Sequence, residues 1–191
     1  MKSVYLIGGV GAGKSTVLDI LKKDYGAGII QADEVARELM QPGKIGHRQV
    51  VAAMGTTFLR PDGSIDRQKM AEEVFSNRDA IGMMNAIIHP LVWDRIRFMM
   101  DHSDRELTVV EAAIYDAPHR PWFDEVWYVY ADISTRLHRL MESRGYSDEK
   151  CHEIMSNQRS DADFRRVADH VIDNSTTLDD VRRQLEEILE T

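Results

Sequence analysis

A glycine-rich run near the start of the chain has the residue types and spacing to hold a polyphosphate. Residues 8–16 read Gly-Gly-Val-Gly-Ala-Gly-Lys-Ser-Thr and follow the apolar run 4–7. They match Gly-x-x-x-x-Gly-Lys-[Ser/Thr], the pattern of a P-loop, in which successive backbone N–H groups form a nest for phosphate oxygens. Apolar residues at helical spacing over 17–21 predict a helix directly afterwards, whose N-terminus favours anions. We therefore predict that the chain binds a nucleoside triphosphate.

The residue types of this P-loop also predict a division of roles. Its glycines let the backbone approach phosphate closely. Lys14 is expected to reach the β- and γ-phosphates, and the Ser15 hydroxyl to ligate Mg²⁺. The residues that we expect to contact the nucleotide are Gly9, Gly11, Ala12, Gly13, Lys14, Ser15 and Thr16.

Short apolar runs alternate with helical patterns along the chain and predict an α/β fold. Besides residues 4–7, runs at 28–30, 107–110, 126–130 and 171–172 give about five strands. Strands separated by helices form a parallel sheet covered by helices, and ligands bind beyond the carboxyl ends of the strands. With the P-loop after the first strand, we expect a P-loop NTPase-type sheet within one domain, residues 1–191. Its core is expected at about 1–41, 103–133 and 167–191.

Two stretches fall outside that core. Residues 42–102 show helical patterns without a clear strand and are expected to form a helical substrate-binding insertion. In it, 60–63 read Arg-Pro-Asp-Gly and predict a turn, while Pro90 is expected to interrupt a helix over 79–102. The polar helical stretch 134–166 is expected to form a lid.

Asp33 follows the second predicted strand, at the start of a helix. One interpretation is an ordinary helix N-cap. The other is catalytic, because an aspartate in phosphoryl-transfer enzymes accepts the proton of the attacking hydroxyl or orients it. The two interpretations are compatible.

Glu111 ends the third predicted strand, and its carboxylate is a candidate for holding a Mg²⁺-bound water. The alternative is a satisfied polar residue at a strand end. Asp132, after the fourth strand, competes for the metal role, although capping of the next helix is the preferred interpretation. His89, taken alone, is interpreted as a structural histidine before a proline.

The predicted lid is rich in arginine. Its arginines are Arg136, Arg139, Arg144, Arg159, Arg165 and Arg166. Acidic residues there are similarly frequent, so one interpretation is a mixed, solvated face. The alternative is functional, since arginines on a closing lid stabilise a transferring phosphoryl group.

Composition limits the function classes. The chain has 191 residues, of which 43% are hydrophobic and 29% charged, with a net charge of −8. An acidic balance argues against nucleic acid as a partner, and no apolar stretch approaches the length of a membrane span. The single cysteine, Cys151, and the absence of a visible secretory signal lead us to expect a cytoplasmic protein.

Taken together, these residues resemble the dephospho-CoA kinase family over nearly the whole chain. Outside the P-loop, the motifs are Ala32-Asp33, Ala36-Arg37-Glu38-Leu39, Pro42-Gly43, Asp62-Gly63-x-Ile65-Asp66-Arg67, Val74-Phe75, Asn85-x-x-x-His89-Pro90, Gln158 and Ala168-Asp169-x-Val171-Ile172-Asp173-Asn174. The Asp62–Arg67 motif combined with His89-Pro90 is far more specific than the P-loop, which occurs in many kinases.

The resemblance implies that ATP, with Mg²⁺, phosphorylates the ribose 3′-hydroxyl of dephospho-CoA, the last step of coenzyme A synthesis. It implies that Asp33 faces the acceptor hydroxyl and that residues near His89 hold the pantetheine-bearing substrate. Arg139 and Arg144 are implied to act on the phosphates, with Arg144 one place from its usual position. Residues near Asn174 are implied to lie against the adenine. The partners are then these small molecules alone, with a monomer expected and weak oligomers left open.

Two other hypotheses remain. One is a related small-molecule kinase acting on a nucleoside monophosphate, shikimate or gluconate. The other is a nucleotide sensor or GTPase-like switch without catalysis. Against a switch, the sequence contains no Asn-Lys-x-Asp element for guanine, and it also lacks the Leu-Ser-Gly-Gly-Gln signature of transporter ATPases.

Overall fold

A computed structural model describes residues 1–76 and 78–190. It divides into two compact units, Met1–Ile29 with Ser103–Thr191, and Ile30–His102. Three residues of the family motifs, Arg67, Val74 and Phe75, have side chains outside the described part.

The first unit is built on the predicted sheet, which has five strands in the order β2-β3-β1-β4-β5. They are β1 (Lys2–Ile7), β2 (Gly28–Gln31), β3 (Leu107–Glu111), β4 (Glu125–Tyr130) and β5 (His170–Asp173). β1 pairs in parallel with both β3 and β4, so Leu6 lies opposite Glu111 on one side and Trp127 on the other. The P-loop therefore leaves the sheet from its central strand.

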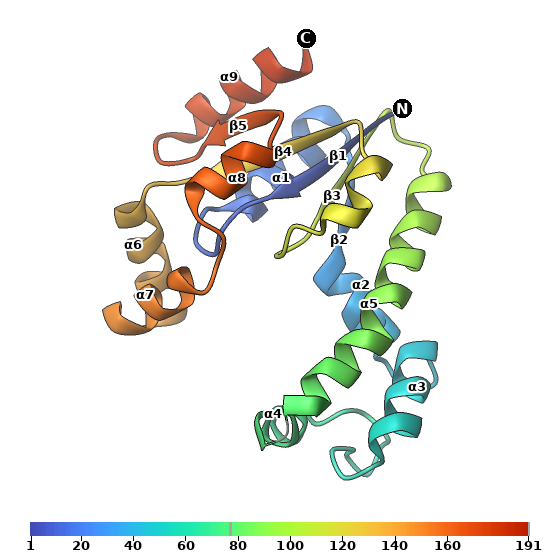
Figure 1. The fold of residues 1–191 in the computed structure, drawn as a ribbon. Helices are drawn as coiled ribbons and strands as arrows, with labels where there is room; N and C mark the ends of the chain where they lie inside the picture. Colours follow the sequence, from blue (N-terminus) through green and yellow to red (C-terminus); the bar gives the residue numbers. More distant parts are fainter. Residues whose placement is uncertain (77, 191) are drawn as a thin grey trace. The chain divides into compact units, whose positions relative to one another are not determined.

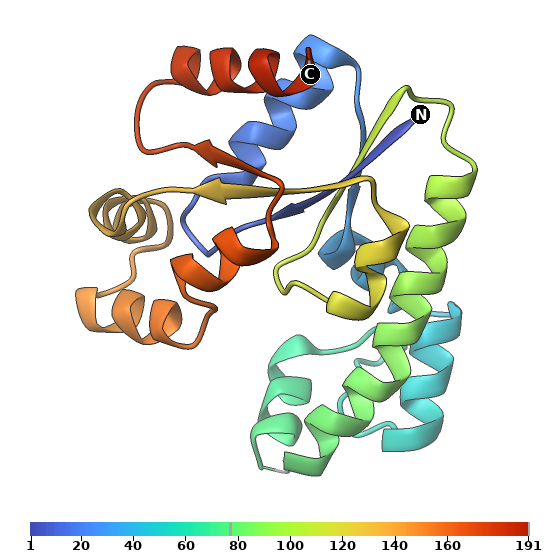
Figure 2. The same cartoon turned by 45° about the horizontal axis from the view of Figure 1, so that its top comes forward.

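The other elements of the first unit are helices. They are α1 (Lys14–Tyr25), the 3₁₀-helix η1 (Ala117–Trp122), α6 (Ile133–Arg144), α7 (Asp148–Ser156), α8 (Asp161–Val167) and α9 (Leu178–Leu189). Figure 2 shows α1 and α9 on one face, with η1 and α8 on the other. Side chains alternate along β1 accordingly: Val4 and Leu6 join α1 and α9 in the main core, whereas Tyr5 stacks on Phe123, just after η1.

The second unit is helical, and it begins at Ile30, before the stretch 42–102 that the sequence predicts to be helical. It comprises α2 (Ala32–Leu39), α3 (Ile45–Met54), α4 (Arg67–Ser76) and α5 (Arg78–Asp101). Its own core is centred on Val50, Phe58 and Met70. The predicted turn at 60–63 is confirmed, because Gly63 has φ 81° and its N–H donates to the Arg60 carbonyl.

Helix α5 differs from the prediction at Pro90. The expected interruption is wrong, because α5 is one helix from Arg78 to Asp101 (Figure 1). Proline removes a single helical hydrogen bond. Burial of Trp93, Ile96 and Met100 along the same helix outweighs that loss. In the part of the chain that the structure describes, no helix, this one included, is both long and apolar enough to span a bilayer.

Candidate active site

The P-loop backbone has the conformation that its glycines allow. Gly11 and Gly13 have φ values of 77° and 84°, and Gly13 is the N-cap of α1. Two of the glycines also lie very close to side chains from distant parts of the sequence. A Cβ atom on Gly9 would lie 2.6 Å from the Arg136 guanidinium, and one on Gly13 would collide with the Asn174 side chain.

This conformation leaves a row of donors at the start of α1. Within the described residues, no protein acceptor is hydrogen-bonded to the N–H groups of Gly11, Gly13, Lys14 or Ser15. N–H groups at a helix N-terminus bind anions, and these four lie within five consecutive residues, where they can meet the oxygens of a polyphosphate. The residues present therefore fit a nucleotide phosphate.

Lys14 lies folded over the loop from which it comes. Its Nζ donates to the Gly8 carbonyl over 2.8 Å and lies 3.5 Å from Glu111 Oε1. Both charged side chains are largely buried, at 15% and 11% exposed. The structure thus brings together two candidates 97 positions apart, the P-loop lysine and the carboxylate that ends β3.

Asp132, the competing candidate for the metal, caps α6 as preferred. Its carboxylate accepts hydrogen bonds from the Thr135 N–H and from the hydroxyls of Ser134 and Thr135. These bonds stabilise the ionised form and hold the pKa of Asp132 well below its usual range. A carboxylate engaged in this way has a structural role at the helix start.

The tip of the P-loop is Val10, and it is held by side chains whose contacts with it the sequence does not predict. The Arg136 Nε donates to the Val10 carbonyl over 2.8 Å, and its Nη2 donates to Gln158 Oε1 over 2.9 Å. The same Gln158 oxygen accepts the Val10 N–H over 3.0 Å. Burial lowers the pKa of the Arg136 guanidinium. Both backbone groups of Val10 are thus held by side chains from α6 and from the segment after α7.

A second contact supports the other end of the loop. Arg139 Nη1 donates to the Ala12 carbonyl over 3.3 Å, and its Nη2 donates to the Asn174 carbonyl over 2.8 Å. The Asn174 amide donates to the Ala12 carbonyl over 2.8 Å, and this side chain is 2% exposed. The structure therefore brings Arg139 and Asn174 together against the loop backbone.

The remaining arginines of the stretch 134–166 lie elsewhere. Arg144 is the last residue of α6, is exposed and lies 5.9 Å from the Tyr146 ring. Arg159 lies over the Tyr115 ring, whereas Arg165 and Arg166 pair with carboxylates on their own helix. In the described structure, the arginines hydrogen-bonded to the P-loop are Arg136 and Arg139.

Asp33 belongs to the second unit and is exposed. The N-cap interpretation is wrong, because β2 continues to Gln31 and that residue is the N-cap of α2. Asp33 is the second residue of the helix, where an acidic side chain interacts favourably with the helix dipole. Its carbonyl accepts a hydrogen bond from Arg37 Nε over 3.1 Å.

His89 lies in the same unit, on the exposed face of α5. The Trp93 indole donates to its Nε2 over 3.4 Å, and the two rings meet edge to face. Asn85, from the same motif, precedes it by one helical turn, so the two side chains share a face of α5.

The contacts of Arg136 lead to a prediction. We expect Arg136→Ala to raise the KM for ATP about tenfold, because the loop tip loses the charge-assisted hydrogen bond to the Val10 carbonyl and Gln158, which holds the Val10 N–H, loses its own bond to Arg136. Arg166→Ala is the matched control, since Arg166 is 74% exposed and pairs only within its helix. Initial-rate kinetics with varied ATP measure both variants. Equal KM values for the two would contradict a role for Arg136 in shaping the loop.

The five-stranded parallel sheet, with the P-loop between its central strand and α1, defines the fold of the P-loop kinases. The family model for dephospho-CoA kinase matches residues 3–180. The chain belongs to the dephospho-CoA kinase family.

Individual relatives agree with this assignment, and solved structures agree with the fold. The dephospho-CoA kinase of Geobacillus kaustophilus is 35% identical over 191 residues, covering 98% of this chain and 94% of the relative. That of Streptomyces avermitilis is 38% identical, covering 98% and 92%. Among solved structures, the protein TT1252 of Thermus thermophilus has a TM-score of 0.80 at 22% identity, covering 99% and 96%. Dephospho-CoA kinase from Campylobacter jejuni has a TM-score of 0.73 at 21% identity, covering 100% and 96%.

Proposed function

We propose that this kinase transfers the γ-phosphoryl group of ATP, bound with Mg²⁺, to the ribose 3′-hydroxyl of dephospho-CoA. The observation that carries the proposal is the P-loop, whose row of backbone donors lies beside Lys14 in a chain of this family. Phosphoryl transfer requires mainly alignment and neutralisation of charge. Backbone donors that are in place before the nucleotide binds neutralise its charge without having to reorganise.

On the donor side, the N–H groups of Gly11, Gly13, Lys14 and Ser15 bind phosphate oxygens, and Lys14 leaves Glu111 to neutralise the β- and γ-phosphates. Bound Mg²⁺ supplies further neutralisation of the phosphates. The exposed Ser15 at the start of α1 would hold the metal through its hydroxyl, and Glu111 would hold it through a bound water. Gly9, Ala12 and Thr16 complete the nucleotide contacts.

On the acceptor side, Asp33 orients the 3′-hydroxyl and accepts its proton, while His89 contacts the substrate. The exposed carboxylate of Asp33 in the first turn of α2 supports this role. Arg139 and Arg144 stabilise charge on the transferring group, and Asn174 lies near the adenine. Contacts of Arg139 and Asn174 with the P-loop support their place in the nucleotide half of the site.

The same proposal covers the organisation of the chain. Residues 1–191 act as a single P-loop kinase domain, with its core at about 1–41, 103–133 and 167–191. Residues 42–102 are the substrate-binding insertion, and 134–166 close as a lid. The protein works as a cytoplasmic monomer on small molecules, without nucleic acid or membrane partners.

The test is transfer of labelled phosphate from ATP to a panel of acceptors by the purified protein. We expect rapid, Mg²⁺-dependent formation of coenzyme A from dephospho-CoA and its loss on addition of EDTA. AMP, shikimate and gluconate are expected to react at least 10²-fold more slowly, because binding energy from the rest of the acceptor is used in the transition state. A preference for another acceptor would overturn the proposal. Tight ATP binding without transfer to any acceptor would instead favour a sensor.

A further inference from the structure

A buried tyrosine of β4 supports the segment that holds the P-loop tip. Tyr128 is 3% exposed, and its hydroxyl donates to Asp161 Oδ1 over 3.1 Å. Burial raises the pKa of the Tyr128 hydroxyl, so the group stays protonated and acts as the donor in this bond. Neither residue belongs to the P-loop or to the motifs that carry the family resemblance.

Asp161 is the first residue of α8, and its carboxylate has two partners. Besides the Tyr128 hydroxyl, it accepts a hydrogen bond from Arg165 Nε, over 2.8 Å, one turn further along the helix. The Tyr128 ring also stacks on Phe164, with the ring centroids 4.9 Å apart, and Phe164 is itself buried. The ring and the hydroxyl of one side chain therefore both attach α8 to the central part of the sheet.

The start of α8 is connected directly to the residue that holds the loop. Gln158 lies three positions before Asp161, so the chain between them spans at most about 11 Å. The connection is closed further by Ser160, whose hydroxyl caps α8 by accepting the Asp163 N–H over 3.2 Å. Gln158 Oε1 in turn accepts the Val10 N–H. A shift of the start of α8 therefore displaces the carboxamide on which the loop tip depends.

We propose that Tyr128 and Asp161 are positioning residues for nucleotide binding. The Tyr128 hydroxyl fixes the Asp161 carboxylate and the start of α8, which places Gln158, and Gln158 holds Val10 so that the loop fits the phosphates. Neither Tyr128 nor Asp161 touches the nucleotide. Their effect is to fix the loop before binding, which lowers the cost of ordering it around the ligand. The proposal rests on the proposed function for the identity of the nucleotide as ATP.

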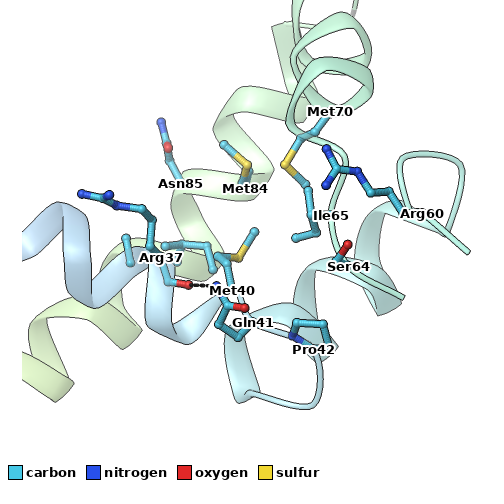
Figure 3. Close-up of a pocket in the computed structure, with 12 residues that line it drawn as sticks. Arg37, Met40, Gln41, Pro42, Arg60, Ser64, Ile65, Met70, Met84 and Asn85 are labelled. Atoms are coloured by element: carbon cyan, nitrogen blue, oxygen red, sulfur yellow. Dashed lines mark hydrogen bonds between the residues drawn. The ribbon is translucent and has the colours of Figure 1, made fainter. Parts of the chain in front are cut away.

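This chain of contacts lies entirely within the first unit. The helical unit has a cavity of its own, and all the residues that line it belong to that unit (Figure 3). Asp33 and His89, the residues expected on the acceptor side, also belong to the helical unit. We therefore expect changes at Tyr128 and Asp161 to alter ATP binding and to leave the KM for dephospho-CoA within twofold.

The first variant is Tyr128→Phe, which removes the hydroxyl and keeps the ring that stacks on Phe164. It is expected to raise the KM for ATP about threefold with kcat within twofold, because one hydrogen bond is lost. Calorimetry with Mg²⁺ and β,γ-imido-ATP is expected to show the same change in Kd. Tyr130→Phe is the matched control. Tyr130 lies on the same strand, and in the described part of the chain its ring contacts Arg165 without a hydrogen bond from its hydroxyl.

A double-mutant cycle separates positioning from a merely structural role. In a Gln158→Ala background, Tyr128→Phe is expected to have no further effect on the KM for ATP, because its influence reaches the loop through Gln158. Asp161→Ala is expected to raise this KM about fivefold, and Asp161→Asn to retain most of the affinity, since its carboxamide oxygen still accepts the Tyr128 hydroxyl.

Thermal unfolding shows which variants fold, and Tyr128→Phe decides if Asp161→Ala does not. Unchanged ATP affinity in Tyr128→Phe, or effects of Tyr128→Phe and Gln158→Ala that simply add, would overturn the positioning role. The measurement with β,γ-imido-ATP needs no acceptor. Failure of the wild type to phosphorylate dephospho-CoA would therefore overturn the proposed function alone.

Discussion

Lys14→Ala is expected to reduce kcat for phosphoryl transfer by about 10³-fold. The substitution removes the cation that neutralises charge developing on the phosphates, and loss of one such group in a preorganised site has an effect of this order. Steady-state kinetics with saturating ATP and dephospho-CoA measure it. Lys22→Ala is the control, since Lys22 is an exposed lysine in the last turn of the same helix. A decrease of less than tenfold for Lys14→Ala would contradict the role proposed for Lys14.

The same variant has a structural consequence that must be separated from catalysis. Without Lys14, the nearly buried Glu111 loses its ion-pair partner 3.5 Å away. Removal of one partner from a buried ion pair destabilises a protein by about 3–5 kcal/mol, because the other charge is left buried and unpaired. Lys14→Ala combined with Glu111→Gln removes that charge. We expect the double variant to recover thermal stability without recovering turnover.

Asp33→Asn is expected to reduce kcat by about 10²- to 10³-fold, because the amide keeps the shape of the side chain but cannot accept the proton of the acceptor hydroxyl. Glu34→Gln is the matched control, since Glu34 is the next residue in the same exposed helical turn. The KM for ATP is expected to stay within a few-fold in both variants. Near-normal turnover by Asp33→Asn would remove the residue from the reaction, and an equal loss in both variants would point to a general charge effect.

Features encoded within short segments are predicted well from the sequence. Each of the five strands coincides with an apolar run, and the P-loop at 8–16 joins a strand to a helix as its pattern requires. The interpretation of Asp132 as a cap is also local, because the bonds that satisfy its carboxylate come from the next three residues.

Contacts between segments that are far apart in the sequence could not be predicted from local patterns. Arg136 and Gln158 are 22 positions apart, and their meeting at Val10 depends on how the chain turns between α6 and α7. Gln158 carries a signal as part of the family resemblance, but nothing in the spacing of Arg136 distinguishes it from five other arginines in the stretch. The errors at Asp33 and Pro90 have a related origin. At Asp33 the local pattern predicted a helix cap, but the end of β2 determines where α2 begins. At Pro90 it predicted a break, but burial of side chains along α5 keeps the helix continuous.

The contacts of Lys14 affect the free energy with which this loop binds a nucleotide. Its ammonium group is already satisfied by the Gly8 carbonyl and Glu111, so ATP does not meet a vacant cation. Binding is an exchange of partners, and its free energy is the difference between two sets of charge-assisted bonds rather than the strength of the new set alone. In the proposed reaction, Glu111 is released from the ion pair and its carboxylate becomes available as a hydrogen-bond acceptor. The resting ion pair therefore competes with the phosphates for Lys14, and a ligand of this loop must displace Glu111 before it reaches the ammonium group.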